Sequence, residues 1–211
     1  MRMRHKKNLI PRMERCASLQ IKNPEEYRGQ WRKNTGYSQI QAEFGCGKGR
    51  FTVETAKNNP EILLVAVEKV PDAMVIAMER AFNAELTNIK FLDMDVANLK
   101  EIFCPGELSV IYINFPDPWP RQKEIKRRLT APSFLDLYRE ILKPGGRIEY
   151  KTDQLGLFEY TLTELAAAGF EITESTTNLH TNGPVGIMTD YEAKFYEQGI
   201  KICRCVARKP L

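Results

Sequence analysis

The sequence predicts an α/β fold: a doubly wound, mostly parallel sheet with an antiparallel hairpin at one edge. Short apolar runs of strand length alternate with longer segments of helical periodicity, which is the pattern of successive strand–helix–strand units. Acidic residues stand at or just beyond the ends of five of these runs, where open parallel sheets bind their ligands. The last two runs have no clear helix between them, which indicates an antiparallel pair.

The first part of the chain, residues 1–38, is polar and irregular and is predicted to be a basic arm with a short helix. The arm is the sequence MRMRHKK. The helix should begin at Asn23-Pro24, a cap residue followed by a first-turn proline. It would carry Tyr27 and Trp31 on one face, as anchors onto the main domain. Residues 39–211 are predicted to form that domain, because 211 residues fit one domain with an appendage.

The first half of the domain is predicted to hold three strands, each followed by a helix. The strands are 39–44, 62–67 and 89–92, and the helices are 50–58, 71–86 and a short one near 99–103.

The second half is predicted to continue with four strands. These are 110–113, 147–151, 170–177 and 200–207, with helices at 131–142 and 155–168. Pro144-Gly145-Gly146 should stop the first of these helices. The stretch HTNGPVGIMTDYEAKF is expected to be a long loop between the last two strands, although Thr189 and Glu192 also fit a capping box that starts a helix.

Composition limits the function classes. Five cysteines without a CxxC pair, and only two histidines, argue against a disulfide framework and a metal site. No apolar run reaches membrane-spanning length, and no apolar stretch follows the basic start to make a signal peptide. We therefore expect a cytoplasmic protein with no metal and no membrane contact.

The loop after the first strand indicates a cofactor site. Gly45, Gly47 and Gly49 allow close backbone approach at a helix N-terminus, but Arg50 stands where a dinucleotide fingerprint requires glycine. Glu43 precedes the glycines, and its carboxylate would repel a pyrophosphate. The same carboxylate suits the ammonium and sulfonium groups of S-adenosylmethionine.

Two further acids fit the same cofactor. Glu68, at the end of the second strand, suits a ribose diol because one carboxylate accepts from two hydroxyls. Asp95, after the third strand, suits the exocyclic amine of adenine. The alternative for each acid is a helix cap or a surface ion pair, and Asp95 fits a cap best.

The stretch from Val110 to Leu129 carries the strongest functional signal. Three prolines stiffen the loop around Asp117 and Trp119. A dense cationic patch follows: Arg121, Lys123, Lys126, Arg127 and Arg128. A fixed carboxylate beside such a patch indicates chemistry on a polyanion. The same pattern also fits a proline-rich surface turn followed by a solvated run of charges.

These motifs together give the chain its family resemblance. The segments RMRHK, EFGCGKG, AVEK, NFPDPWPRQKEIKRRL, KTD and GIMTDYEAKF resemble those of the bacterial tRNA (guanine-N7-)-methyltransferases. The resemblance covers the whole chain. It implies the Rossmann-like fold of class I methyltransferases, S-adenosylmethionine as methyl donor, S-adenosylhomocysteine as product, and a guanosine of the tRNA variable loop as acceptor.

The resemblance also implies roles for residues. The acids that match the family's cofactor side are Glu43, Glu68, Asp95 and Asp117, and Asp117 also matches its proposed catalytic residue. The positions that match its substrate contacts are Arg121, Asp153, Thr189, Asp190, Tyr191 and Glu192. In this chain Gln122 and Glu124 interrupt the basic run that the family often has.

The implied chemistry suits these residues. Guanine N7 already has an in-plane lone pair, so no strong base is needed. The positive charge moves from sulfur to the methylated ring, and a fixed carboxylate such as Asp117 favours that charge. Arg127 and Arg128 are expected to hold phosphates, and Trp119 to stack on a base or pack as a lid.

Three other readings remain open. They are a methyltransferase acting on adenine or cytosine, a catalytically idle RNA-binding subunit, and an NAD-dependent dehydrogenase, which Arg50 disfavours. We expect tRNA as the partner of a monomer or homodimer.

Overall fold

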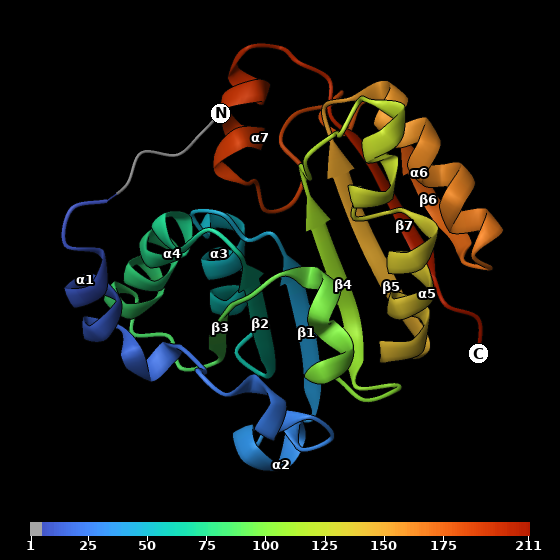
Figure 1. The fold of residues 1–211 in the computed structure, drawn as a ribbon. Coiled ribbons are helices and arrows are strands. Elements are labelled where there is room, and N and C mark those ends of the chain that lie inside the picture. Colours follow the sequence, from blue (N-terminus) through green and yellow to red (C-terminus); the bar gives the residue numbers. More distant parts are fainter. Residues whose placement is uncertain (1–5) are drawn as a thin grey trace. The chain divides into compact units, whose positions relative to one another are not determined.

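The computed structural model describes residues 6–211, and its chain forms two compact units. The first unit ends at Phe103 and the second begins at Cys104. Residues 1–5, which make up most of the predicted basic arm, lie outside the described residues. Figure 1 shows strands with flanking helices in each unit.

The described part of the first unit contains three parallel strands in the order β3-β2-β1. They are β1 (Gln39–Phe44), β2 (Ile62–Glu68) and β3 (Ile89–Asp93). Nearly every side chain of β1 and β2 is buried, and β2 is a continuous apolar run, as is usual for a strand inside a parallel sheet. The connecting helices α3 (Arg50–Asn58) and α4 (Pro71–Asn83) pack against each other and against β2. The glycine loop thus lies between β1 and α3, as expected.

The N-terminal segment packs onto this first unit. Its helical elements are α1 (Leu9–Arg15), η1 (Ala17–Leu19), η2 (Pro24–Tyr27) and α2 (Trp31–Thr35). Gly29, at φ +73°, lies in the turn that separates η2 from α2, so the single helix expected from Asn23 is two short ones. Trp31 is fully buried against Phe103, and its indole N–H donates to the Ile102 carbonyl at 2.7 Å.

This segment also covers one strand edge. Gln20 forms a parallel bridge with Phe91 of β3, and the Ile21 amide donates to the Phe91 carbonyl at 3.1 Å. Lys90 of the same strand donates to the Ser18 carbonyl at 2.8 Å. The Phe91 carbonyl of β3 therefore has a partner within the chain.

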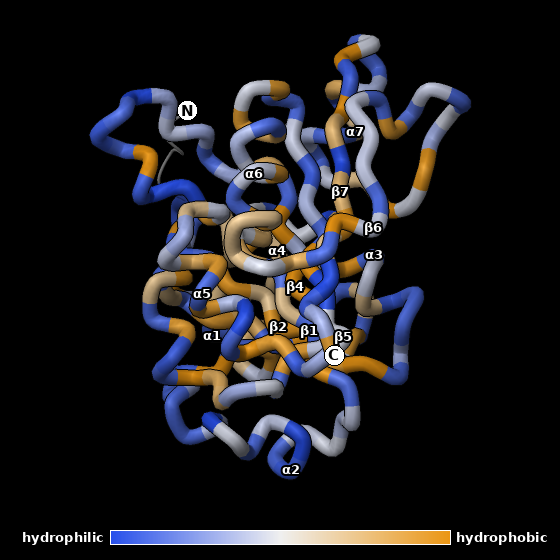
Figure 2. The backbone as a smooth tube through the Cα atoms, turned by 90° about the vertical axis from the view of Figure 1, so that its right-hand side faces the viewer, coloured by the Kyte–Doolittle hydropathy of each residue, from blue (hydrophilic) through white to orange (hydrophobic). Residues whose placement is uncertain are grey.

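The second unit has the strand order β4-β5-β7-β6. The strands are β4 (Leu108–Asn114), β5 (Leu142–Thr152), β6 (Glu171–Thr176) and β7 (Cys203–Arg208). β4 and β5 are parallel, whereas β7 runs antiparallel to both β5 and β6. The predicted antiparallel pair is therefore confirmed. In Figure 2 the apolar residues follow the strands of each unit, and polar residues dominate the connecting loops.

Four helical elements complete the second unit. They are η4 (Gln122–Arg127), α5 (Pro132–Ile141), α6 (Leu155–Ala167) and α7 (Asp190–Glu197). The expectation that no helix separates the last two strands is wrong, because α7 lies between β6 and β7. β5 also begins earlier than expected. Leu142 already pairs with Leu108, so the Pro144-Gly145-Gly146 segment lies inside the strand, next to a register shift.

Among residues 6–211, no helix combines the length and apolar character needed to cross a lipid bilayer.

Candidate functional site

The glycine loop folds back over the end of β2. The amides of Gly45 and Cys46 donate to the Val67 carbonyl at 2.8 and 3.2 Å. Gly45 and Gly47 have φ of +81° and +56°, and a Cβ at either position would meet no atom within 4 Å. The backbone there is open to a ligand, and its conformation requires glycine.

Gly49 serves a different purpose. A Cβ at this position would lie 2.4 Å from the Cβ of Ala77, which belongs to α4. Gly49 therefore allows α3 and α4 to approach each other closely, and it does not form part of the open loop.

Glu43 places a buried carboxylate beside this loop. Its side chain is 1% exposed, and Oε2 accepts from the Thr52 hydroxyl at 2.5 Å. Thr52 is on α3, directly after the glycines. A buried negative charge is costly unless it meets donors or a cation, so this position favours a positively charged ligand group.

Glu68 fastens the loop from the other side. Its Oε2 accepts from the Gly47 amide and its Oε1 from the Val70 amide, both at 2.9 Å. Burial raises the pKa of Glu68 above its ordinary value, and these amide donors oppose the rise. Burial, together with the charges of Glu43 and Glu68, raises the pKa of the Cys46 thiol well above its ordinary value. Cys46 is therefore a protonated packing group.

Asp95 caps a helix, which is the alternative that the sequence allowed. Its Oδ1 accepts from the Ala97 amide at 3.0 Å, at the start of η3 (Val96–Glu101). Its Oδ2 lies 3.8 Å from the Lys69 ammonium. The carboxylate remains half exposed, so the cap does not exclude a ligand contact. In register, Glu68 pairs with Asp93, which precedes Asp95 by two residues.

The loop after β4 has two residues in an uncommon backbone conformation, and an arginine side chain holds its carbonyl groups. Phe115 and Trp119 have φ of +51° and +38°, values that are uncommon for bulky residues. The Phe115 amide donates to the Lys151 carbonyl at 2.8 Å. Arg128 donates to the Pro118 and Trp119 carbonyls at 3.0 and 3.3 Å. The exposed Asp117 is thus carried on a loop with little freedom.

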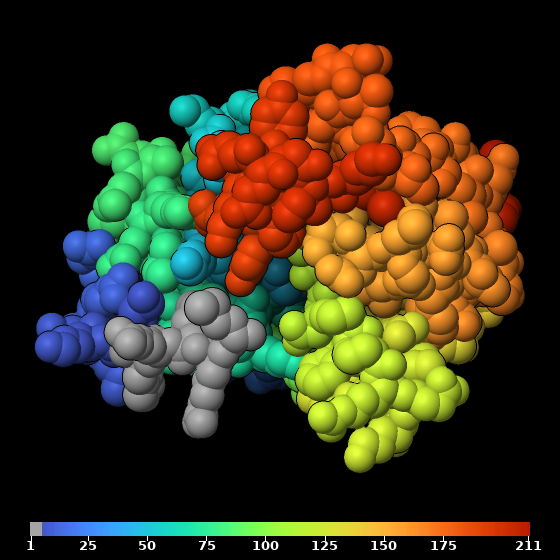
Figure 3. All heavy atoms as spheres, turned by 90° about the horizontal axis from the view of Figure 1, so that it is seen from above, coloured from blue at the N-terminus to red at the C-terminus, as the bar shows by residue number. Residues whose placement is uncertain are grey.

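The basic patch divides into two groups. The Arg127 guanidinium lies 3.5 Å from the Trp119 ring centroid, and that of Arg128 lies 4.5 Å from the ring of Tyr160. Both arginines therefore brace the loop. The cations whose side chains are exposed on this segment, without such ring contacts, are Arg121, Lys123 and Lys126. Figure 3 shows the segment, in yellow-green, as a projecting lobe.

The end of β5 and the start of α7 hold the remaining predicted site residues. Thr189 and Glu192 form the capping box that the sequence allowed, with the Glu192 amide donating to Thr189 Oγ1 at 3.0 Å. Glu192 is fully buried, whereas Tyr191 is 63% exposed. Asp153 follows β5 and accepts from the Gln154 side chain at 2.5 Å. The Glu192 carboxylate is directed into the protein, which separates it from its neighbours in the motif.

Two functional candidates, Lys151 and His180, were missed from sequence. Both contact the Glu192 carboxylate, at 3.0 Å each. A lysine near the end of a predicted strand was the available signal, because a buried lysine needs a partner.

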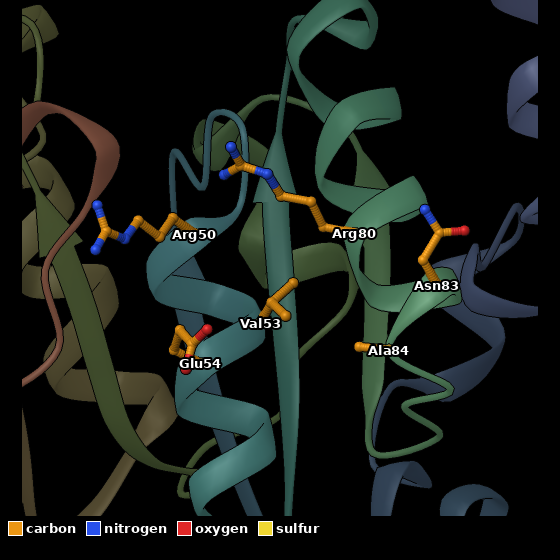
Figure 4. Close-up of a pocket in the computed structure, with 6 residues that line it drawn as sticks. All are labelled: Arg50, Val53, Glu54, Arg80, Asn83 and Ala84. Atoms are coloured by element: carbon orange, nitrogen blue, oxygen red, sulfur yellow. The ribbon is translucent and has the colours of Figure 1, made fainter.

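A groove of about 460 Å³ lies apart from the predicted residues. It is formed by α3 and α4, and Figure 4 shows its lining: Arg50, Val53, Glu54, Arg80, Asn83 and Ala84. Arg80 reaches toward the glycine loop and donates to the Lys48 carbonyl at 3.0 Å. Within residues 6–211, no group of three or more His, Cys, Asp or Glu side chains has the arrangement of a metal site.

A protein-family model with the description "Putative methyltransferase" matches residues 38–205. The chain belongs to this methyltransferase family. The match runs from the residue before β1 to the middle of β7, so it includes the glycine loop, the Asp117 loop and α7.

Solved structures share the fold. The 16S rRNA methyltransferase KamB is 15% identical, with a TM-score of 0.66, over 85% of this chain and 92% of that one. A variant of the 16S rRNA (adenine(1408)-N(1))-methyltransferase from Catenulisporales acidiphilia is 17% identical, with a TM-score of 0.60, over 89% and 92%. Another structure of that enzyme, which contains SAM, has a TM-score of 0.56 at 17% identity over 89% and 92%. These likenesses show that the chain has the α/β Rossmann-like methyltransferase fold.

Proposed function

We propose that this protein is a tRNA (guanine-N7-)-methyltransferase that uses S-adenosylmethionine. The observation that carries the proposal is the segment from Asn114 to Leu129. It holds the Asp117 carboxylate on a loop fixed by three prolines and by Arg128, next to exposed cations. Membership of a methyltransferase family supports the reaction class.

The residues of the first unit fit the cofactor. Glu43 supplies a buried negative charge for a cationic group, and Gly45 and Gly47 leave the backbone open. Glu68 has lone pairs beyond those used by the Gly47 and Val70 amides, and a ribose diol would occupy them. The cofactor would supply a methyl group on a sulfonium, ready for in-line displacement.

Asp117 is proposed to act by electrostatics and positioning. Methylation at N7 gives the guanine ring a positive charge and requires no proton to leave N7. A carboxylate beside the ring therefore lowers the energy of the developing charge, and orienting the base supplies further rate. Arg121, Lys123 and Lys126 are proposed to contact phosphates of the RNA backbone. Asp153, Thr189, Asp190 and Tyr191 are proposed to contact the acceptor nucleoside.

The deciding experiment uses labelled cofactor, unmodified tRNA and analysis of the methylated nucleoside. We expect N7-methylguanosine. Asp117→Asn should lose most of the activity, whereas Asp136→Asn, a matched change at an exposed acid of α5, should retain it. Cofactor binding without transfer to any RNA would instead indicate the idle RNA-binding subunit.

Methylation of another base is the second candidate function. The structural likeness to 16S rRNA adenine methyltransferases is the observation that favours it. Small ribosomal subunits should therefore be tested alongside tRNA. A methylated adenine in either RNA would replace the guanine-N7 assignment.

A further inference from the structure

Three polar side chains of the second unit meet in its interior. Lys151, His180 and Glu192, here called the Glu192 cluster, have side chains that are 9%, 5% and 0% exposed. The Lys151 ammonium lies 3.0 Å from both oxygens of Glu192 and donates to the Ile187 carbonyl at 3.0 Å. His180 Nε2 lies 3.0 Å from Glu192 Oε1. The Thr189 amide donates to Oε2 at 3.3 Å.

The hydrogen bonds fix the proton positions. The Val185 amide donates to His180 Nδ1 at 3.2 Å, so that nitrogen carries a lone pair and no proton. Nε2 must then carry the hydrogen that it donates to Glu192. His180 is therefore a neutral ring in its Nε2–H form. One ammonium and one carboxylate balance, and both ring nitrogens are satisfied.

The cluster joins two segments that flank the proposed acceptor site. The Lys151 ammonium donates to Glu192 at the start of α7. The Lys151 carbonyl accepts from the Phe115 amide, where the Asp117 loop begins. The rings of Phe115 and Phe195 lie 5.9 Å apart, and those of Phe195 and Tyr191 lie 6.3 Å apart. Movement of α7 would therefore reach the Asp117 loop through packed rings.

We propose that the Glu192 cluster sets the geometry between the start of α7 and the Asp117 loop. Lys151, His180 and Glu192 are positioning residues, and Glu192 acts through Thr189, Asp190 and Tyr191 and not by touching the base. This inference rests on the proposed function, because it assigns these two segments to the acceptor base.

Stability alone does not account for such a cluster. A buried ion pair contributes little net stability, and apolar residues of similar size often do as well. A fully partnered polar network instead favours one arrangement, because any shift leaves buried groups unpaired. Such a restraint is useful where a misplacement of about 1 Å can cost about 100-fold in rate.

The kinetic test uses Glu192→Gln, Lys151→Met and the double variant, with Glu197→Gln on the exposed face of α7 as control. Each single variant should lower kcat for tRNA by about 100-fold, while the cofactor Kd and the control stay near wild type. The double variant removes both charges together, so it should recover thermal stability but not kcat. Recovery of kcat together with stability would reduce the cluster to a structural role and overturn the inference.

A second readout needs no methyl transfer. In a Trp31→Phe background, Trp119 is the remaining tryptophan of the chain's two. Glu192→Gln should increase acrylamide quenching of Trp119, and Glu197→Gln should not. Nitrogen-15 spectra of the parent protein should show His180 in the Nε2–H form. If the wild type fails to methylate tRNA, the proposed function is wrong, yet the quenching still decides the positioning role. Unchanged quenching in Glu192→Gln contradicts it.

Discussion

Arg127 and Arg128 show how neighbouring cations take different roles. From sequence, both belong to a run expected to hold phosphates. In the structure Arg128 donates to two carbonyls of the Asp117 loop, and Arg127 stacks on Trp119. A planar guanidinium can stack and donate in a fixed direction, which a lysine ammonium cannot do in the same way. The exposed lysines of the segment are thus better placed for RNA phosphates.

Salt dependence should separate these roles. Lys126→Ala should reduce the slope of log affinity for tRNA against log salt by about one, because one phosphate contact is lost. Arg128→Ala should leave that slope unchanged and lower the methylation rate, because the Asp117 loop loses its brace. Binding measured over a series of salt concentrations, with single-turnover rates, tests both. If both variants reduce the salt-dependence slope equally, Arg128 binds a phosphate and does not only brace the loop.

Glu68 should make cofactor affinity depend on pH. Burial raises its pKa, and only the ionised form accepts from two ribose hydroxyls. Affinity should therefore fall on acidification through that raised pKa, at a higher pH than an ordinary glutamate would titrate. A raised pKa also means that the folded state binds this proton more tightly, so Glu68 does not contribute to acid unfolding. Calorimetry over a pH series that extends downward from neutral should show the fall.

The control for this pH effect is Glu68→Gln. It should bind the cofactor more weakly at neutral pH and should lose the acid-side decrease. If the wild type and the variant have parallel pH profiles, another group controls binding.

At the scale of elements, local pattern predicted the parallel strands well. β1 and α3 have the expected bounds because apolar runs, glycines and turns are local signals. β5 begins earlier than predicted because Leu142 pairs with Leu108. Pairing between residues so far apart cannot be recognised from the local sequence of either segment. α7 was uncertain for the same reason. Its capping box was visible, but Glu192 depends on Lys151, 41 residues away.

Packing between α3 and α4 should make Gly49 the least replaceable glycine of its loop. Gly49→Ala combines a left-handed backbone with a contact at 2.4 Å, whereas Gly45→Ala meets only the backbone penalty. We expect Gly49→Ala to lower the free energy of unfolding by about 2–4 kcal/mol and Gly45→Ala by about 1 kcal/mol. Denaturant titrations of both variants measure the difference. Equal losses would show that the helices can move apart at little cost.

For the molecule as a whole, the N-terminal segment is more than an arm. The sequence predicted Trp31 as an anchor, and the structure confirms that it is buried against Phe103 with its indole N–H satisfied. The acids at strand ends were also predictable, because strand ends are read from local pattern. The bracing roles of Arg127 and Arg128 were not, because cation–ring contacts depend on tertiary packing.

Trp31→Ala should therefore destabilise the fold by about 3–5 kcal/mol, the usual cost of removing a fully buried aromatic side chain. The free energy of unfolding from denaturant titration measures it. Tyr27→Ala provides the comparison, because Tyr27 contacts Trp31 but remains half exposed. A loss below about 1 kcal/mol in Trp31→Ala would mean that the segment detaches readily.

The bridge between Gln20 and Phe91 bears on how the protein behaves at high concentration. A bare strand edge offers unpaired amides and carbonyls to other chains and can nucleate aggregation. Here the Phe91 carbonyl is already occupied by Ile21, and Gln20 lies alongside the strand. Loss of residues 18–21 to a protease would uncover this edge, so nicked protein should form intermolecular β-structure while the intact chain stays dispersed.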